Sequence, residues 1–301
     1  MMEWSFDSKF DDTYNTWNGY LISSRADIDE KSEALWISPG YAGHGSAVHF
    51  PPNSYYVVDQ NFDLTNLSFT VSAWFAVTFN FSTNMYDYFS LFVHCQKTDT
   101  DQCLHFVIGE NYVRLAFFDD DLVVPAPINV NQWYHVAYVY DRSIPTQSIY
   151  FNGYPHSTGF RRYSGLYMGN SSTITLGGIP LMTTSNINSG YIDKVTFVSR
   201  VKTDSEILVE ATLVAYYPFD GSYLDAGPNQ IMSTTQLATS FDSAGQVRQA
   251  LLFYSTVTSY FQTNGFYYLG VTNYSYSFTL WVYPFANTGT ILQVEKKMRK
   301  R

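Results

Sequence analysis

The sequence predicts an all-β protein, folded as a β-sandwich or jelly roll, and three observations support this prediction. Of the 301 residues, 18% are aromatic and only 14% are charged, and abundant Tyr, Phe, Thr and Val favour strands over helices. Short apolar segments recur between turn signals along the chain, as in sandwiches and jelly rolls. Only residues 204–213 have a helical pattern, with Ser205 and Glu206 near its start.

The composition also excludes several classes of protein. With 17 basic and 26 acidic residues the net charge is −9, so the chain lacks the basic surface that binds nucleic acid. Hydrophobic residues make up 46% of the chain, which is enough to bury a core. No apolar run reaches the roughly 18 residues that span a bilayer, and the first residues lack the features of a signal peptide.

The expected strands follow one another at short intervals. In residues 67–76, Phe69, Val71, Ala73 and Phe75 alternate with residues that face the other way, which indicates a strand with one face in the core. Residues 133–140 are β-branched and aromatic on both faces, which is typical of a central strand. We expect further strands at residues 88–94, 104–108, 113–118, 148–151, 174–176 and 191–198.

Cys95 and Cys103 flank a polar turn between two of these strands. The arrangement predicts a β-hairpin, and cysteines that face each other across a hairpin come within disulfide distance. We therefore predict a disulfide, with two free thiols as the alternative. His94 and His105 supply the other elements of a zinc site, but their spacing matches no conventional zinc motif.

Four N-x-Ser/Thr triplets begin at Asn66, Asn80, Asn170 and Asn273. Each is a potential N-glycosylation site, although such triplets also arise by chance in a chain rich in Asn, Ser and Thr. Together with the predicted disulfide they favour an extracellular location.

The sequence also contains an internal repeat. The motif at residues 4–7, with Asp12 after it, returns 213 residues later, and the block at residues 66–75 returns 207 residues later. The order is kept while the spacing drifts by a few residues, which indicates a tandem duplication of a unit of about 210 residues. The second copy stops soon after its strand that contains Trp281.

These observations predict a domain organisation. Residues 1–205 are expected to form a complete jelly roll and residues 206–212 a linker or short helix. Residues 213–294 are expected to form a partial second copy. Residues 295–301 form a basic tail with five of the 17 basic residues, which we interpret as a break in composition, with a weak charged contact as the alternative.

Several blocks resemble the laminin-G-like, concanavalin A-type jelly roll found in tandem arrays of large extracellular proteins. They lie at residues 68–74, 131–137, 149–153, 176–178 and 190–195. The match covers residues 1–212, whereas only the opening third of the second copy fits. The resemblance implies a concanavalin A-like jelly-roll β-sandwich, one complete domain plus a partial second copy, belonging to an extracellular protein.

The resemblance also implies a metal site. In the wider fold a structural calcium ion joins an N-terminal acidic residue to an Asp in the closing strand, and the matching positions are Asp7 and Asp193. Ordinary turn and strand-end carboxylates are the alternative. We expect no cofactor besides this ion.

The leading functional prediction is a non-catalytic binding or adhesion module for a glycan or an extracellular protein. The best candidate ligand-binding residues are Arg161, Arg162, Tyr163 and Tyr167, in a loop that mixes guanidinium and phenol groups. A structural spacer in a multidomain array is one alternative.

A glycoside hydrolase of the same fold is the other alternative. Such enzymes carry a strand-borne pair of carboxylates about 5 Å apart, and the nearest acidic segment, residues 27–30, lacks the spacing. We therefore predict that the protein is not an enzyme. His135 is expected to be a packed, hydrogen-bonded histidine of a central strand.

Overall fold

The computed structural model describes residues 1–23, 35–81, 87–156, 161–179, 186–187, 189–254, 258–266, 268–269, 271–272, 274–286 and 288–295. The chain divides into two compact units. Unit 1 comprises Met1–Tyr41 and Gly45–Leu213, and unit 2 comprises Ala42–His44 and Val214–Arg301.

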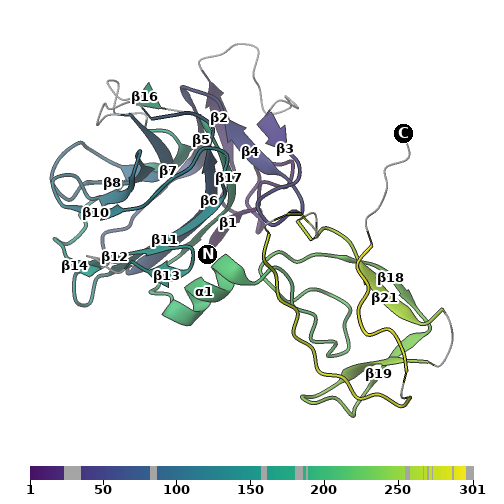
Figure 1. The fold of residues 1–301 in the computed structure, drawn as a ribbon. Helices are drawn as coiled ribbons and strands as arrows, with labels where there is room; N and C mark the ends of the chain where they lie inside the picture. The colour runs from purple at the N-terminus through teal and green to yellow at the C-terminus, as the bar shows by residue number, and fades with distance from the viewer. Residues whose placement is uncertain are drawn as a thin grey trace. The chain divides into compact units, whose positions relative to one another are not determined.

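Unit 1 is a sandwich of two sheets (Figure 1). Sheet A contains β1 (Met2–Trp4), β3 (Trp36–Ile37), β4 (Ala47–Phe50), β6 (Phe69–Val77), β11 (Tyr134–Asp141), β12 (Thr146–Phe151), β13 (Tyr154–Pro155), β14 (Arg161–Tyr163) and β17 (Gly190–Val198). Sheet B contains β2 (Gly19–Ser23), β5 (Ser54–Phe62), β7 (Asp87–Cys95), β8 (Cys103–Ile108), β9 (Tyr112–Ala116), β10 (Asp121–Pro125), β15 (Ser172–Gly177) and β16 (Asn186–Ile187).

Neighbouring strands come from distant parts of the sequence. The order in sheet A is β13-β12-β11-β6-β17-β4-β3, with β1 beside β17 and β14 beside β12. The order in sheet B is β10-β9-β8-β7-β15-β5-β2, with β16 beside β7. Apart from the parallel pair of β16 and β7, the strand pairs are antiparallel. The predicted all-β sandwich is confirmed.

The core lies between the two sheets. Phe69, Val71, Ala73 and Phe75 of β6 are all buried in it, as the alternation predicts. The strand is hydrogen-bonded to β11 on one side and to β17 on the other, so it occupies the middle of sheet A. Because antiparallel strands alternate their side chains, the residues between these four point to the outer face of the sheet.

Among the described residues of unit 1 there is one helix, α1 (Asp204–Thr212), and it packs on that outer face. Its N-cap Thr203 and Glu206 form a capping box, which satisfies backbone donors at the helix start. Ile207 packs with Ala137, Val139 and Tyr150 of sheet A. Residues 206–212, expected to form a linker or short helix, lie in α1 and belong to unit 1.

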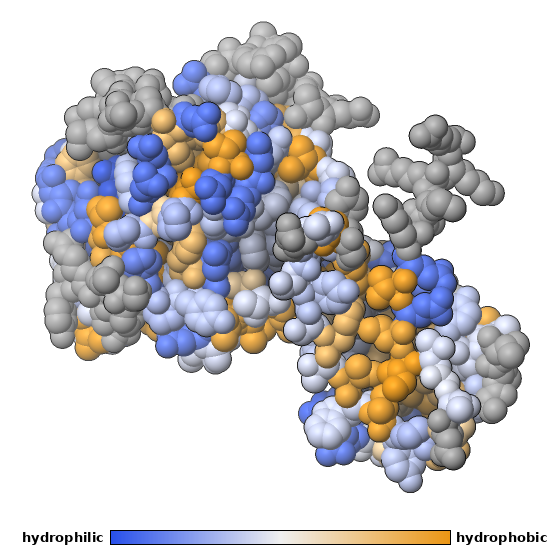
Figure 2. Space-filling model, in the orientation of Figure 1, coloured by the Kyte–Doolittle hydropathy of each residue, from blue (hydrophilic) through white to orange (hydrophobic). Residues whose placement is uncertain are grey.

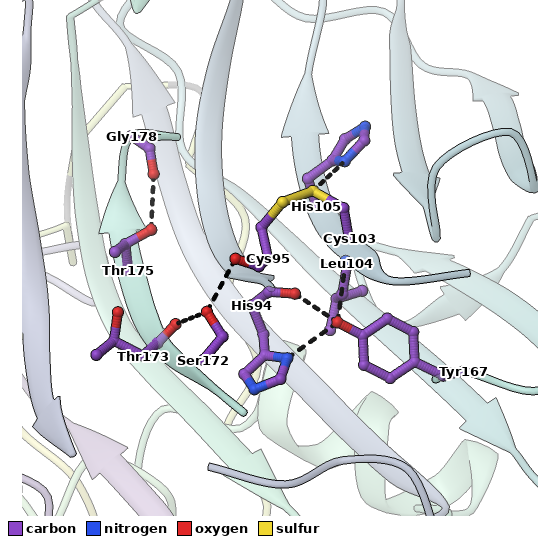
Figure 3. Close-up of a disulfide and its surroundings, with 10 residues drawn as sticks. All are labelled: His94, Cys95, Cys103, Leu104, His105, Tyr167, Ser172, Thr173, Thr175 and Gly178. Carbon is purple, nitrogen blue, oxygen red and sulfur yellow. Dashed lines mark hydrogen bonds between the residues drawn. A yellow bond between two sulfur atoms is a disulfide. The ribbon is translucent and has the colours of Figure 1, made fainter. Parts of the chain in front are cut away.

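Cys95 and Cys103 form the predicted disulfide (Figure 3). They lie directly opposite each other on β7 and β8, at the two ends of the polar turn. The described part of the chain contains no free cysteine. The zinc alternative therefore fails, because both thiol groups are used in the disulfide.

The described residues of unit 2 form two small antiparallel sheets. In one, β18 (Ser233–Leu237) pairs with β21 (Tyr260–Thr263), and in the other, β19 (Thr239–Asp242) pairs with β20 (Ala250–Phe253). Large hydrophobic side chains are exposed in this unit, including Trp281 at 80% and Phe285 at 81%, and hydrophobic residues cover part of its visible face (Figure 2). Within the described residues, no helix has the length and apolar character to cross a membrane.

Candidate binding site

The two acidic residues of the predicted metal site lie close to each other in unit 1. Asp7 follows β1 and is exposed, between two residues with positive φ, Phe6 at 52° and Ser8 at 60°. Asp193 lies in β17 at a register shift and is 4% exposed. Burial raises the pKa of the Asp193 carboxyl well above its usual value, and the charge of Asp7 raises it further. Burial and the charge of Asp7 therefore both disfavour the ionised form of Asp193.

The loop before β4 holds both carboxylates in place. The backbone N–H of Tyr41 donates to Oδ2 of Asp193 at 3.0 Å, and the N–H of Ser46 donates to Oδ1 of Asp7 at 3.0 Å. Gly45 has φ of +59°, and a Cβ atom there would lie 1.8 Å from Oδ1 of Asp7. Only glycine permits this close approach.

The donor set fits calcium in part. Calcium takes six to eight oxygen ligands from carboxylates, carbonyl groups and water, and the Asp7–Asp193 pair offers two carboxylates beside irregular backbone. Across the residues that the structure describes, no group of three or more His, Cys, Asp or Glu side chains is arranged to hold a metal. Carbonyl oxygens and water would have to supply the remaining ligands.

Aromatic side chains lie beside Asp193 on the outer face of sheet A. His135, Trp74 and Asp193 lie opposite one another on β11, β6 and β17. The ring of Tyr41 stacks on Trp74, with centroids 4.1 Å apart and an interplanar angle of 15°. The loop that binds the carboxylates thus also covers the indole of Trp74.

A second set of rings continues from this stack. Trp133 lies 6.5 Å from Tyr41 and 6.3 Å from Tyr191, and His49 lies 5.1 Å from Tyr191, measured between ring centroids. All of these residues are half-buried, so each remains partly exposed to solvent. We define the aromatic patch as Tyr41, His49, Trp74, Trp133 and Tyr191.

Polar atoms beneath the patch have no hydrogen-bond partner among the described residues. They are Nε1 of Trp74 and both ring nitrogens of His135. Burial lowers the pKa of His135 to about 4, opposed by the charge of Glu210, so the imidazole is neutral at pH 7. His135 is packed as predicted, with its ring 5.3 Å from that of Trp74 between centroids. The predicted hydrogen bond is wrong, because neither ring nitrogen has a hydrogen-bond partner within the part of the chain that the structure describes.

The structure describes only part of the predicted ligand-binding loop. Arg161, Arg162 and Tyr163 form β14, and their side chains lie outside the described residues. Tyr167 is 1% exposed, and burial raises the pKa of its phenol. The prediction that Tyr167 binds ligand at the surface is wrong, because its side chain belongs to the core of unit 1.

Hydrogen bonds satisfy the buried hydroxyl group of Tyr167 (Figure 3). Its hydroxyl group donates to the carbonyl oxygen of His94 and accepts from the N–H of Leu104 at 3.2 Å. It also lies 2.9 Å from Nδ1 of His94. The phenol thus joins the ends of β7 and β8 beside the disulfide.

Three of the predicted glycosylation sites are exposed, at Asn66, Asn80 and Asn170. Asn273 lies outside the described residues. Exposure is the condition that glycosylation of an N-x-Ser/Thr triplet requires.

The fold and the sequence together identify the family. The laminin G family model described as the concanavalin A-like lectin/glucanases superfamily matches residues 50–208. The chain belongs to this family. Among curated proteins, none matches the chain.

Solved structures of similar fold include proteins that bind sugars. Domain 4 of AbnA, a GH43 extracellular arabinanase from Geobacillus stearothermophilus in complex with arabinotriose, is 17% identical at a TM-score of 0.51, over 70% of this chain and 97% of that one. The CBM40 of the Ruminococcus gnavus IT-sialidase, bound to α2,3-sialyllactose, is 15% identical at a TM-score of 0.41, over 55% and 96%. The receptor-binding domain of botulinum neurotoxin type G is 12% identical at a TM-score of 0.47, over 69% and 49%. At these identities the likeness shows the fold alone.

Proposed function

We propose that unit 1 is a non-catalytic glycan-binding module and that the aromatic patch is its binding surface. The observation that carries this proposal is the run of half-buried rings at Tyr41, Trp133 and Tyr191 beside two carboxylates. The C–H face of a sugar ring is apolar and packs on aromatic rings, and aromatic side chains dominate the energetics of such surfaces. Polar side chains at the rim then orient the sugar hydroxyl groups.

Two features at the rim support a sugar ligand. Asp7 is exposed beside the loop that carries Tyr41, and its carboxylate accepts hydrogen bonds. Ser189 forms a 2.7 Å hydrogen bond with Nε2 of His49, which fixes the imidazole at the end of the patch. The arabinotriose complex of the arabinanase domain agrees with a glycan as the class of ligand.

We further propose that calcium binds between Asp7 and Asp193. A cation there would offset the repulsion between the two carboxylates and the cost of burying Asp193. It would also fix the loop that places Tyr41 on Trp74, since that loop donates to both carboxylates. The ion would then favour glycan binding indirectly, because it would fix the positions of the rings in the aromatic patch.

An extracellular location agrees with this function. The disulfide between Cys95 and Cys103 is of the kind that persists in oxidising compartments, and three exposed glycosylation triplets point the same way.

We also infer that unit 2 repeats the opening of unit 1, and two sets of hydrogen bonds support this. In unit 1, Oδ1 of Asp12 accepts from the N–H of Glu3 at 2.7 Å. In unit 2, Oδ1 of Asp225 accepts from the N–H of Tyr216 at 2.7 Å. Both members of the second pair lie 213 residues after those of the first, as in the sequence repeat.

The second set involves the counterparts of Asp7. Asp7 accepts from the N–H of Ser46, and Asp220 accepts from the N–H of Gln249, both at 3.0 Å. Asp7 and Asp220 thus accept a hydrogen bond from the backbone at corresponding positions of the two units. The sequence repeat is therefore accompanied by a repeat of this hydrogen bond. The calcium proposal concerns unit 1, which contains both Asp7 and Asp193.

A glycan array probed with the 301-residue chain in calcium, and again in EDTA, tests the proposed function. Binding of defined glycans in calcium supports the glycan-binding module, and its loss in EDTA supports the calcium site. Equal binding in both conditions would keep the module and reject a required metal. Absence of binding would favour the structural spacer, whereas cleavage of a bound glycan would favour the glycoside hydrolase.

A further inference from the structure

The last part of unit 2 exposes many large apolar side chains. Between residues 276 and 285, three aromatic side chains are at least 80% exposed, those of Trp281, Tyr283 and Phe285. Soluble proteins rarely leave a continuous apolar surface uncovered, and such a surface marks a site of interaction. We define residues 276–283 as the exposed segment.

Four further apolar residues of the exposed segment occupy alternate positions. They are Tyr276, Phe278, Leu280 and Val282, each between 44% and 56% exposed. The residues 207 positions earlier in the sequence repeat are the four core residues of β6, at positions 69, 71, 73 and 75, and these are at most 1% exposed. The exposed segment thus has the alternation of a strand with one face in a core.

The edges of the exposed segment are also uncovered. In unit 1, β6 forms hydrogen bonds with β11 along one edge and with β17 along the other. Within the described chain, residues 274–286 belong to no strand pair. A segment with strand character and no paired edge is a template for pairing with another chain. This exposure is observed in the segment itself and does not depend on the repeat.

The composition of this region favours a second copy of the same chain as the partner. Residues 249–294 contain no Asp, Glu, Lys, Arg or His. Like charges that lie opposite each other destabilise a strand pair, so two copies of this uncharged segment can pair without repulsion. Natural proteins protect exposed strands from self-pairing with charged side chains, especially lysine, and this segment carries no such protection.

An antiparallel pair of identical segments also brings the apolar residues together. Directly opposite residues lie on the same face of an antiparallel pair. When the pair is centred on Thr279, Tyr276 lies opposite Val282 of the second copy, and Phe278 lies opposite Leu280 of the second copy. Both copies then contribute the same surface, as a twofold symmetric interface requires.

The exposed area is enough for a stable dimer. A fully buried aromatic side chain contributes roughly 150–250 Å². At the exposed fractions given above, the apolar side chains of residues 276–285 present about 800 Å² per copy. An interface of standard size buries about 800 Å² per partner.

We propose that two copies of the chain associate through residues 276–282, paired antiparallel about Thr279. The backbone groups of one edge form the hydrogen bonds of the pair, and the apolar side chains of the two copies pack against one another. The proposal concerns unit 2 alone, so it can fail while unit 1 binds glycans, and the converse also holds.

Sedimentation velocity of the 301-residue chain over a range of concentrations tests the association. We expect a dimer at about 100 µM that dissociates on dilution. Leu280→Lys should weaken the dimer at least about tenfold, because it buries a charge against Phe278 of the second copy. Leu224→Lys is the matched control, since it makes the same change in unit 2 outside the exposed segment. Both leucines are more than half exposed in the single chain, so neither substitution disturbs its core.

Cysteine cross-linking tests the register of the pair. Cys95 and Cys103 are joined in a disulfide and are the two cysteines of the chain, so an introduced cysteine has no free thiol to meet in its own copy. Thr279→Cys places two cysteines opposite each other at the twofold axis, at a separation that a disulfide spans. We expect disulfide-linked dimers of this variant under mild oxidation. Ser277→Cys is the matched control, because it lies opposite Trp281 of the second copy and should cross-link much less.

Three results would overturn the proposal. One is a chain that stays monomeric at about 100 µM, or that associates beyond a dimer. Another is a dimer that Leu280→Lys does not weaken, or that Leu224→Lys weakens equally. The third is equal cross-linking of Ser277→Cys and Thr279→Cys, which would reject the pairing about Thr279.

Discussion

Glycine at position 45 shows how one residue sets the geometry of the candidate site. Its φ of +59° lies in the left-handed region, and Oδ1 of Asp7 occupies the space where a side chain would begin. A residue with a Cβ atom must therefore adopt a strained conformation and also displace the carboxylate. This glycine is required because Asp7 lies against the backbone there.

Gly45→Ala should destabilise unit 1 by more than about 1 kcal/mol, because left-handed strain and the clash with Asp7 act together. Urea unfolding monitored by tryptophan fluorescence measures the loss. The matched control is Gly289→Ala, where a Cβ atom meets nothing within 4 Å. Equal stability of the two variants would contradict this account of the loop.

Buried neutral histidines should make the fold sensitive to acid. The pKa of His135 is lowered from its ordinary value of 6.5 to about 4 in the folded chain. Between these values the unfolded chain binds a proton that the folded chain does not, so stability is full above pH 6.5 and falls toward pH 4. The loss from this site is at most about 1.4 kcal/mol per pH unit.

Urea unfolding at pH 7 and pH 5 measures this loss, and His135→Gln should show a smaller one. His105, with a pKa lowered to about 3 mainly by burial, contributes with the same sign, so some loss remains in the variant. An unchanged pH dependence in His135→Gln would reject the role of this residue.

At the scale of elements, the strands in which hydrophobic and polar residues alternate clearly could be predicted from the sequence. The alternating pattern at residues 67–76 predicts β6 (Phe69–Val77) to within two residues. The strand β5 (Ser54–Phe62) was missed because its second half, which includes Asp59 and Asn61, is polar and exposed. Backbone pairing with β2 and β15 makes it a strand, and pairing of distant segments leaves no mark in the local pattern.

The aromatic patch was missed for a related reason. Aromatic residues on the outer face of β6 and β17 have the same sequence pattern as core residues. This is because sheet A is covered on both faces, by sheet B on the inner face and by α1 or the loop before β4 on the outer face. The outer Trp74 and Tyr191 therefore carry the same local pattern as buried residues. Tyr167 shows the opposite error, since the sequence predicts it at the surface and the structure buries it. Its hydroxyl group forms hydrogen bonds with His94 and Leu104, and the local sequence pattern does not reveal these partners.

The capping box predicts how α1 responds to substitution. Thr203→Ala removes the side chain that accepts from the N–H of Glu206 and should destabilise unit 1 by about 1 kcal/mol. Thr203→Ser keeps the acceptor and should cost much less. Thermal unfolding followed by circular dichroism compares the two, and equal melting temperatures would mean that the cap does not support the packing of α1.

For the whole molecule, the sandwich places the candidate binding site on one sheet of unit 1. Sheet A carries the aromatic patch, with Asp7 and Asp193 beside it. The patch includes residues on neighbouring strands that are far apart in sequence, such as Trp74 and Tyr191. The fold class could be predicted from the composition and the alternating hydrophobic pattern, whereas the patch depends on the strand order, which the sequence alone does not determine.

The central claim is that the aromatic patch binds glycans, and calorimetry with a glycan identified on the array tests it most directly. Trp133→Ala should weaken binding at least about tenfold, since one stacked ring is a large share of such a site. The matched control is Tyr154→Ala, which removes a ring that is 62% exposed elsewhere on sheet A. Retained affinity in a folded Trp133→Ala variant, or an equal loss in Tyr154→Ala, would contradict the claim.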